Sequence, residues 1–314
     1  YIKTFTIPAD GSSITQVQFV EHDNNYAIYN SLIHLYSNIY VLAYSDTDDD
    51  GRIKTFEINS DGNGIIQVFV TEHDSDHGEY NSLVKVDDDT YALAYAGETN
   101  KGYIKAFTIS SDGSSIGGGN ALLLHDDIKA LYNSLVKEDD DTYALAYAGS
   151  DNDGYITTFT ISADGNTISK VATLEHDINA GNYNSLVKVD DDTYALAYTG
   201  NGTDGYITTF TISEDGATIS KVNTLEHDTD YAIYNSLMQI DSDTYALAYS
   251  DSEDDGFITT FTISADGSTI TKVATLEQDT NNGKDNSLVK VDANTVALAY
   301  SGVEQDAYIK TFTI

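Results

Sequence analysis

The sequence predicts an all-β fold, a six-bladed β-propeller with four antiparallel strands per blade. Asn-Ser followed by two apolar residues recurs at intervals of 51 or 52 residues, at Asn30, Asn81, Asn133, Asn184, Asn235 and Asn286. A second motif, typified by the identical YIKTFTI segments at residues 1–7 and 308–314, recurs seven times. Each unit also contains four strand-like segments, and four strands per repeat of about 40–50 residues are typical of a propeller blade.

The unit at residues 184–228 illustrates the expected strands. They are NSLVKV (184–189), TYALAYTG (193–200), GYITTFTI (205–212) and ISKVNTLEHD (219–228). Their β-branched and aromatic residues fit a pleated, half-buried surface, and the Asp, Asn, Gly and Ser residues between them favour turns. The second and third segments lack the period of about 3.6 residues that marks a helix. In the second segment, Tyr and Leu alternate with Ala, so a bulky face can stack on a small one.

Two other architectures fit the repeat less well. An immunoglobulin-like sandwich needs about seven strands in ~100 residues, twice the observed period. A β-solenoid coil is normally shorter than this repeat and lacks four separate turn signals. We therefore expect a propeller.

Strand order raises a question about closure. If NSLVKV is the first strand of a blade, the chain begins with a third and a fourth strand, runs through five complete blades from Asn30, and ends with three strands. We predict a single domain over residues 1–314, whose last blade (286–314) takes its outer strand from residues 14–20. One YIKTFTI segment is then surplus. It could cover a blade edge, pair with another molecule, or be the cut end of a longer array.

With this strand order the unit resembles the WD40 class of propeller along the whole chain. WD40 units pair a His before the first strand with an Asp in the turn between the second and third strands. The corresponding residues are His22, His73, His125, His176, His227 and, in the sixth unit, Gln278, with turn acids Asp50, Asp153, Asp204, Asp255 and Asp306 and with Lys101 in the second unit. The resemblance implies the pairs His22–Asp50, His125–Asp153, His176–Asp204 and His227–Asp255. The Trp-Asp signature is absent from the sequence.

Composition excludes several classes of protein. The net charge is -36, and there is no Cys, which excludes disulfide scaffolds and thiolate metal sites. The acidic balance argues against nucleic acid and anionic membranes as partners, and no apolar run reaches the roughly 18 residues that membrane insertion needs. The excess charge suits a saline exterior, calcium or a cationic partner, although a solvated acidic surface explains it too. We expect an extracellular or cell-surface location.

Two groups of polar residues invite a metal hypothesis. The repeated histidines could bind metal or transfer protons, but same-type residues of radially arranged blades lie far apart, which favours a structural role. Asp46, Asp48 and Asp50 have the D-x-D-x-D-G spacing that places carboxylates around calcium. The bidentate Glu of an EF-hand is missing, and short Asp runs are usually solvated turns. Calcium is thus the one cofactor that the sequence suggests.

A ring of Tyr and Asn residues most resembles a binding site. Each Asn that starts a blade is expected at the rim of the central channel. The candidates are Tyr29, Asn30, Tyr80, Asn81, Tyr132, Asn133, Tyr183, Asn184, Tyr234, Asn235, Asp285 and Asn286. Amides and carboxylates bind sugar hydroxyls, and aromatic rings pack on the apolar face of a sugar. Alternatively, each Asn holds its own loop and each Tyr fills the gap between blades.

Three functions follow from these features. The first is a non-enzymatic recognition or adhesion module that binds glycan or protein. The second is a structural subunit that self-assembles through the surplus strand. The third is a hydrolase or lyase that uses carboxylates at the channel mouth; no G-x-S-x-G, H-E-x-x-H or P-loop motif is present in the sequence. The sequence favours the first of these.

Overall fold

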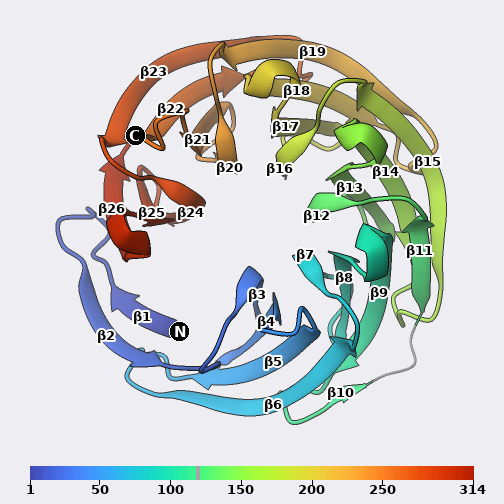
Figure 1. Ribbon diagram of the computed structural model, residues 1–314, viewed down its shortest axis with the longest axis vertical. Helices are drawn as coiled ribbons and strands as arrows, with labels where there is room; N and C mark the ends of the chain where they lie inside the picture. The colour runs from blue at the N-terminus through green and yellow to red at the C-terminus, as the bar shows by residue number, and fades with distance from the viewer. Residues whose placement is uncertain (118–120) are drawn as a thin grey trace. The chain divides into compact units, whose positions relative to one another are not determined.

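The computed structural model describes residues 1–117 and 121–314 and confirms the predicted fold class. The chain forms a six-bladed β-propeller of antiparallel sheets (Figure 1). Strands follow one another side by side in chain order within each sheet, as the WD40-like resemblance implies. The repeat has one extra residue between Tyr103 and His125, where Gly117, Gly118 and Gly119 interrupt the pattern, and residues 118–120 lie outside the described part of the chain.

The first three sheets contain the strands up to residue 177. The first has β3 (Ile28–Tyr36), β4 (Ile39–Ser45), β5 (Gly51–Ile58) and β6 (Ile65–Asp74). The second has β7 (Glu79–Lys85), β8 (Thr90–Ala96) and β9 (Gly102–Ile109), with β10 (Ile116–Gly117) and β11 (Leu122–Asp126) both paired to β9. The third has β12 (Leu131–Lys137), β13 (Thr142–Ala148), β14 (Gly154–Ile161) and β15 (Ile168–Asp177).

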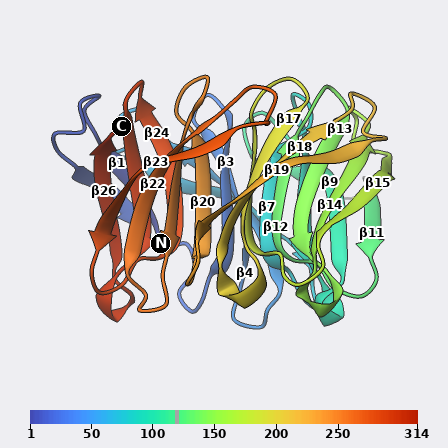
Figure 2. The same ribbon diagram turned by 90° about the horizontal axis from the view of Figure 1, so that it is seen from above.

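The remaining sheets repeat this pattern. The fourth has β16 (Asn182–Lys188), β17 (Thr193–Thr199), β18 (Gly205–Ile212) and β19 (Ile219–Asp228). The fifth has β20 (Ile233–Gln239), β21 (Thr244–Ser250), β22 (Gly256–Ile263) and β23 (Ile270–Asp279), and Figure 2 shows β22 beside β23. The sixth has β24 (Lys284–Asp292), β25 (Thr295–Ser301) and β26 (Ala307–Thr313). Short 3-10 turns before a third strand are η1 (Glu98–Asn100), η2 (Ser150–Asn152), η3 (Asn201–Thr203) and η4 (Val303–Gln305).

Close contacts divide the chain into two compact units. One contains residues 1–6, 15–150 and 157–172, and the other contains residues 7–14, 151–156 and 173–314. Strands β14 and β15 therefore contribute residues to both units. The prediction of a single domain stays a prediction.

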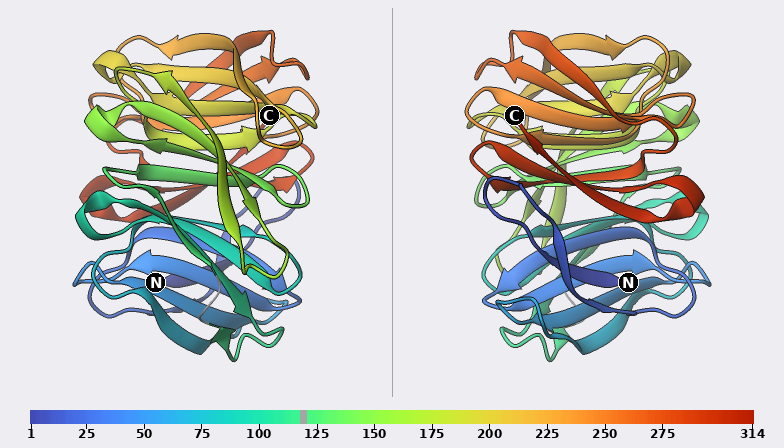
Figure 3. Two further views of the ribbon diagram at one scale, coloured as in Figure 1. Left: turned by 90° about the vertical axis from the view of Figure 1, so that its right-hand side faces the viewer. Right: turned by 90° about the vertical axis from the view of Figure 1, so that its left-hand side faces the viewer.

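The pairing of the N-terminal strands differs from our expectation. We predicted that residues 14–20 complete the last blade, but β2 (Thr15–Val20) pairs with β1 (Ile2–Thr6) in a two-stranded sheet. The two YIKTFTI segments are identical, so β2 has two equivalent partners, and the local hairpin has the lower entropic cost of loop closure. Figure 3 shows this hairpin, in dark blue, against the sheet of β3–β6.

The second strand of each blade forms the core of its sheet. In β17, Tyr194, Leu196 and Tyr198 lie on one face and Ala195 and Ala197 on the other, and each is at most 1% exposed. The expected alternation of bulky and small faces is therefore confirmed. It lets neighbouring sheets approach closely without voids, as interior packing requires.

A tyrosine–aspartate hydrogen bond recurs in all six units. The second-strand Tyr donates its hydroxyl proton to the Asp that follows the loop His or Gln. In five of the six pairs this Asp is the last residue of the fourth strand of the preceding unit, and in the remaining pair Asp23 lies beyond the end of β2. In the fourth sheet, Tyr198 bonds Asp177 at 3.1 Å, and in the fifth, Tyr249 bonds Asp228 at 3.0 Å. The other pairs are Tyr44–Asp23, Tyr95–Asp74, Tyr147–Asp126 and Tyr300–Asp279. Burial and the nearby carboxylate raise the pKa of Tyr249, so the phenol stays a donor at neutral pH.

A lysine caps the carbonyl of the same loop, but it comes from two different strands. In three units the third-strand Lys reaches the carbonyl, as Lys54 does for His22. In three others the third strand has Thr at this place, and a fourth-strand Lys donates instead, as Lys272 does to His227 at 2.9 Å. The equivalents are Lys105–His73 and Lys310–Gln278 for the third strand, and Lys170–His125 and Lys221–His176 for the fourth. A buried carbonyl needs a donor, and either strand can supply it.

This equivalence predicts a rescue within the first blade. Lys54 is 7% exposed, and Lys54→Thr should lower the free energy of unfolding by about 1.5–3 kcal/mol, the usual cost of losing a hydrogen bond to a charged group. Adding Gln67→Lys should recover most of this loss, because Gln67 has the register that Lys221 has in β19: each pairs with the third-strand Phe. Urea denaturation measures both effects. The exposed Lys85→Thr is the control, and failure of rescue would contradict the equivalence.

Candidate functional site

Five tyrosines and one aspartate precede the recurring Asn at the start of each first strand. All six have a left-handed backbone: Tyr29 (φ 52), Tyr80 (φ 51), Tyr132 (φ 54), Tyr183 (φ 50), Tyr234 (φ 55) and Asp285 (φ 51). For a bulky residue this conformation costs on the order of 1–3 kcal/mol, and such strain often occurs at functional sites. The strained backbone therefore marks these six positions as candidates.

The tyrosine rings contact one another from blade to blade. The ring centroids of Tyr29 and Tyr80 are 4.1 Å apart, and those of Tyr80 and Tyr132 are 4.8 Å apart. The centroids of Tyr183 and Tyr234 are 4.9 Å apart. Burial, together with the hydroxyls of Tyr29 and Tyr132, raises the pKa of Tyr80. The row is a packed aromatic surface, and the Tyr80 hydroxyl within it stays protonated at neutral pH.

The asparagines hold the loops that lead into the first strands. Asn81 Nδ2 donates to the Gly78 carbonyl at 2.8 Å, and Asn286 Nδ2 donates to the Gly283 carbonyl at the same distance. Asn30, Asn133, Asn184 and Asn235 make the equivalent bond. The amide nitrogens are thus engaged in the loop, as our alternative interpretation had it. Binding of a ligand by the Tyr and Asn ring stays a prediction.

The loop before β7 departs from the repeat and brings a histidine and a carboxylate together. His77 Nε2 lies 3.4 Å from Glu79 Oε2, and both side chains are partly open to solvent. Glu79 precedes Tyr80. Burial is the main cause of the raised pKa of Tyr29, and the charge of Glu79 adds to it. Burial raises the pKa of Glu79 itself, while His77 opposes this effect. We did not predict this pair from the sequence, although the interrupted repeat at residues 77–79 was an available signal.

A second departure from the repeat lies in the sixth blade. Lys284 Nζ lies 2.7 Å from Asp254 Oδ2, and Ser301 donates its hydroxyl proton to Asp285 Oδ2 at 3.0 Å. The bond to Asp254 raises the pKa of Lys284. The position that is Tyr in five blades is therefore Asp285 in the sixth, and its carboxylate accepts a hydrogen bond from the Ser301 hydroxyl.

The predicted pairs His125–Asp153, His176–Asp204 and His227–Asp255 are wrong, whereas His22–Asp50 stays a prediction. In the part of the chain that the structure describes, both ring nitrogens of His125, His176 and His227 lack a hydrogen-bond partner, as does His22 Nδ1. Each of the first three rings instead packs on the glycine that starts the third strand, where a Cβ would lie about 2.5 Å from the ring. The WD40 resemblance suggested the ring as the donor. Here the loop is held by two other acceptors: the backbone carbonyl of the His accepts from a Lys, and the carboxylate of the next residue accepts from a Tyr.

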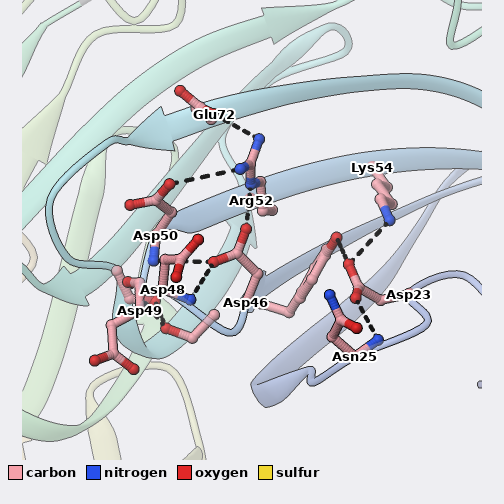
Figure 4. A network of polar contacts seen from close by, with 12 residues as sticks. Asp23, Asn25, Asp46, Asp48, Asp49, Asp50, Arg52, Lys54 and Glu72 are labelled. Carbon is pink, nitrogen blue, oxygen red and sulfur yellow. Dashed lines mark hydrogen bonds and ion pairs between the residues drawn. The ribbon is translucent and has the colours of Figure 1, made fainter.

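An arginine occupies the acidic turn for which we predicted calcium. Arg52 Nε lies 2.7 Å from Asp46 Oδ2, and its terminal nitrogens lie 3.5 Å from Asp50 and 2.6 Å from Glu72 (Figure 4). Asp46 Oδ1 also accepts the backbone amides of Asp48 and Asp50. The guanidinium thus supplies the positive charge that the turn needs. Over residues 1–117 and 121–314, no three His, Asp or Glu side chains gather as a metal site would require.

Among the described residues, no helix has the length and apolar character needed to cross a membrane.

Several solved structures of other proteins have a fold similar to that of this chain. No protein-family model and no curated protein sequence matches the chain. Among solved structures, the periplasmic gluconolactonase PpgL of Pseudomonas aeruginosa is similar, with TM-score 0.69 and 11% identity over 99% of this chain and 90% of that one. A candidate 6-phosphogluconolactonase from Bacteroides uniformis has TM-score 0.68 and 11% identity over 99% and 92%. Sqt1 of Chaetomium thermophilum has TM-score 0.54 and 15% identity over 88% and 66%.

These similarities correct our first functional hypothesis. We expected a non-enzymatic adhesion module, but the similar structures include a gluconolactonase and a candidate 6-phosphogluconolactonase, which are hydrolases. At 11% identity, the likeness itself shows the fold alone.

The buried histidines should make folding sensitive to acid. Burial lowers the pKa of His227 to about 4, below its ordinary value of 6.5. The neutral ring's contribution to stability is therefore complete above pH 6.5 and falls as the pH drops toward 4. We expect His227→Gln, which copies the Gln278 of the sixth unit, to reduce the loss of unfolding free energy between pH 7 and pH 5 by about 2 kcal/mol. Urea denaturation at both pH values measures this, with the exposed His34→Gln as control. Equal losses in wild type and His227→Gln would contradict it.

The acidic turn should fold without calcium. Because Arg52 neutralises Asp46 and Asp50, EDTA should leave the melting temperature unchanged, whereas Arg52→Gln should lower it and make it rise again with millimolar calcium. Thermal unfolding followed by circular dichroism measures both effects. A loss of stability when wild type is treated with EDTA would contradict this expectation and support calcium binding at the turn.

Proposed function

We propose that the protein is a hydrolase that opens sugar lactones at the His77–Glu79 pair. The observation that carries this proposal is the 3.4 Å contact between His77 Nε2 and Glu79 Oε2, placed beside the strained Tyr row. A base oriented by a carboxylate is the arrangement that hydrolases use to activate a nucleophile. The similar gluconolactonase structure supports the choice of lactone as the substrate class.

The chemistry needs only water and these side chains. His77 accepts a proton from a water molecule as the water oxygen attacks the lactone carbonyl carbon. The Glu79 carboxylate stabilises the imidazolium that forms. The bond between the carbonyl carbon and the ring oxygen then breaks, and the ring oxygen takes the proton from His77. The product is the open-chain hydroxy acid.

The neighbouring tyrosines suit the other half of the reaction. The ring centroids of Tyr29 and Tyr80 are 4.1 Å apart, and burial is the largest cause of the raised pKa of each hydroxyl. They remain protonated at neutral pH and can donate to the carbonyl oxygen as negative charge develops on it. Their rings also offer an apolar surface for the face of a sugar.

The charge of the chain favours a neutral substrate. The net charge is -36, and Arg52, the single arginine of the sequence, is occupied by Asp46, Asp50 and Glu72. A phosphorylated sugar needs cationic partners that the loop before β7 does not contain, and a strongly acidic surface repels it. An unphosphorylated aldonolactone avoids both penalties. An extracytoplasmic location, as for the periplasmic gluconolactonase, suits such a substrate.

Hydrolysis of glucono-δ-lactone tests the proposal. Wild type should accelerate opening above the spontaneous rate, measured by proton release in a weakly buffered indicator assay. His77→Gln should lower kcat about 100-fold or more, and Glu79→Gln should lower it by a smaller factor, because proton transfer contributes roughly 10²–10⁴-fold. His34→Gln is the matched control and should retain full activity. Unchanged melting temperatures exclude unfolding as the cause.

Two results would overturn this function. One is a rate with wild type equal to that of buffer across five- and six-membered sugar lactones. The other is hydrolysis that His77→Gln leaves unaltered. Faster turnover of the 6-phosphorylated lactone would reject the argument from charge while keeping the reaction.

A further inference from the structure

The N-terminal hairpin makes the contacts of the outer half of a blade. Within complete blades, a third-strand Thr donates to the carbonyl of a turn Gly 58 residues later: Thr55 to Gly113 and Thr209 to Gly267, both at 2.7 Å. Thr4 of β1 donates to Gly62 in the same way, at 2.6 Å. Ile2 is 7% exposed and packs with Leu42, Tyr44 and Phe56 of the first sheet. Strand β1 therefore has the place of a third strand, and β2 that of a fourth.

The inner half of this blade is missing from the described sheets. In the fourth sheet, the third strand β18 pairs with β17 on one side and β19 on the other. In the described chain, β1 pairs with β2 alone, so its other edge is open. An open edge presents unpaired N–H and C=O groups, which can accept another strand.

The first strand of the first sheet is uncovered as well. Leu32 of β3 is 48% exposed, whereas the equivalent residues Leu83, Leu135, Leu186 and Leu237 are between 4% and 7% exposed. In later blades the amide of this Leu donates to a Ser of the preceding first strand, as Leu83 does to Ser31 and Leu237 to Ser185. No such serine bonds Leu32 among the described residues. The apolar surface and the amide of Leu32 both lack the neighbour that these equivalent residues have.

The sequence of β1 identifies what fits there. Residues 1–7 are identical to residues 308–314, and β26 pairs with β25 in the register Leu298–Lys310, Ala299–Ile309 and Tyr300–Tyr308. A strand with the sequence of β25 can therefore pair with β1 through the same contacts. Its partner β24 would bring Ser287, the residue equivalent to the serine that accepts the Leu amide in other blades.

We propose that β1 and Leu32 form a docking site for a two-stranded inner hairpin of this repeat, which a peptide of that sequence can fill in trans. Two hydrogen-bonding features and one apolar feature define the occupant. Its second strand pairs with β1 and carries alternating Ala and Leu or Tyr. Its first strand covers Leu32 and carries a Ser that accepts the Leu32 amide. This interaction is independent of the proposed lactone hydrolysis.

A synthetic peptide of residues 284–301, fluorescently labelled, tests the site. We expect saturable 1:1 binding to the full chain by anisotropy, with a rise in melting temperature. Leu32→Asp should weaken binding at least tenfold, and the chain should still fold because Leu32 is half exposed. Val70→Asp, at an equally exposed residue of β6, is the matched control and should leave binding unchanged. A Ser287→Ala peptide should bind several-fold more weakly, and a scrambled peptide should not bind.

The outcomes separate this site from its alternatives. Absence of saturable binding, or equal binding by Leu32→Asp and wild type, would overturn the proposal. Sedimentation of the chain without peptide gives the third result: a dimer that the peptide does not dissociate would assign the surface to a second copy and overturn the hairpin as occupant. Lactone hydrolysis measured on Leu32→Asp should be unchanged, so failure of one proposal leaves the other intact.

Discussion

The structure depends on one polar junction that ties each sheet to the end of the preceding unit. A second-strand tyrosine donates to an aspartate, and a lysine caps the carbonyl just before that aspartate. A carboxylate and a carbonyl in a packed region are costly unless they are paired, so this junction has to be satisfied in every unit. Six of the 15 basic residues are used for this purpose: Lys54, Lys105, Lys170, Lys221, Lys272 and Lys310. The strongly negative charge of the remaining surface follows in part from this use.

Much of the fold was predictable because it follows from short-range patterns. Alternation in TYALAYT predicts a sheet with one bulky and one small face, and β17 has both. Contacts between residues of different strands were not predictable in the same way. The sequence places His176 and Asp177 together but does not say that the ring stays unpaired while the carboxylate and the backbone carbonyl make the bonds. The partner of β2 could not be predicted either, since two identical segments compete for it.

The candidate site lies where the repeat is broken. Regular positions, such as the Asn that opens each first strand, are used to hold loops. His77 and Glu79 belong to no repeated pattern, so a search for recurring residues passes over them. Their importance depends on distance and on the strained Tyr80 beside them, and neither can be read from a sequence. In a scaffold of near-identical units, the residues that depart from the repeat are therefore the candidates for chemistry.

The position of the capping lysine has a consequence for how such a chain can change. Whether it sits in the third or the fourth strand, the lysine belongs to the blade that reaches back to the preceding loop. Each unit thus contains the Lys and Tyr donors of the junction, and the preceding unit contains the carbonyl and the carboxylate that accept from them. If one unit is duplicated or deleted, every remaining donor still has an acceptor in the unit before it. This junction therefore places no limit on the number of repeats, which can change by duplication of single units.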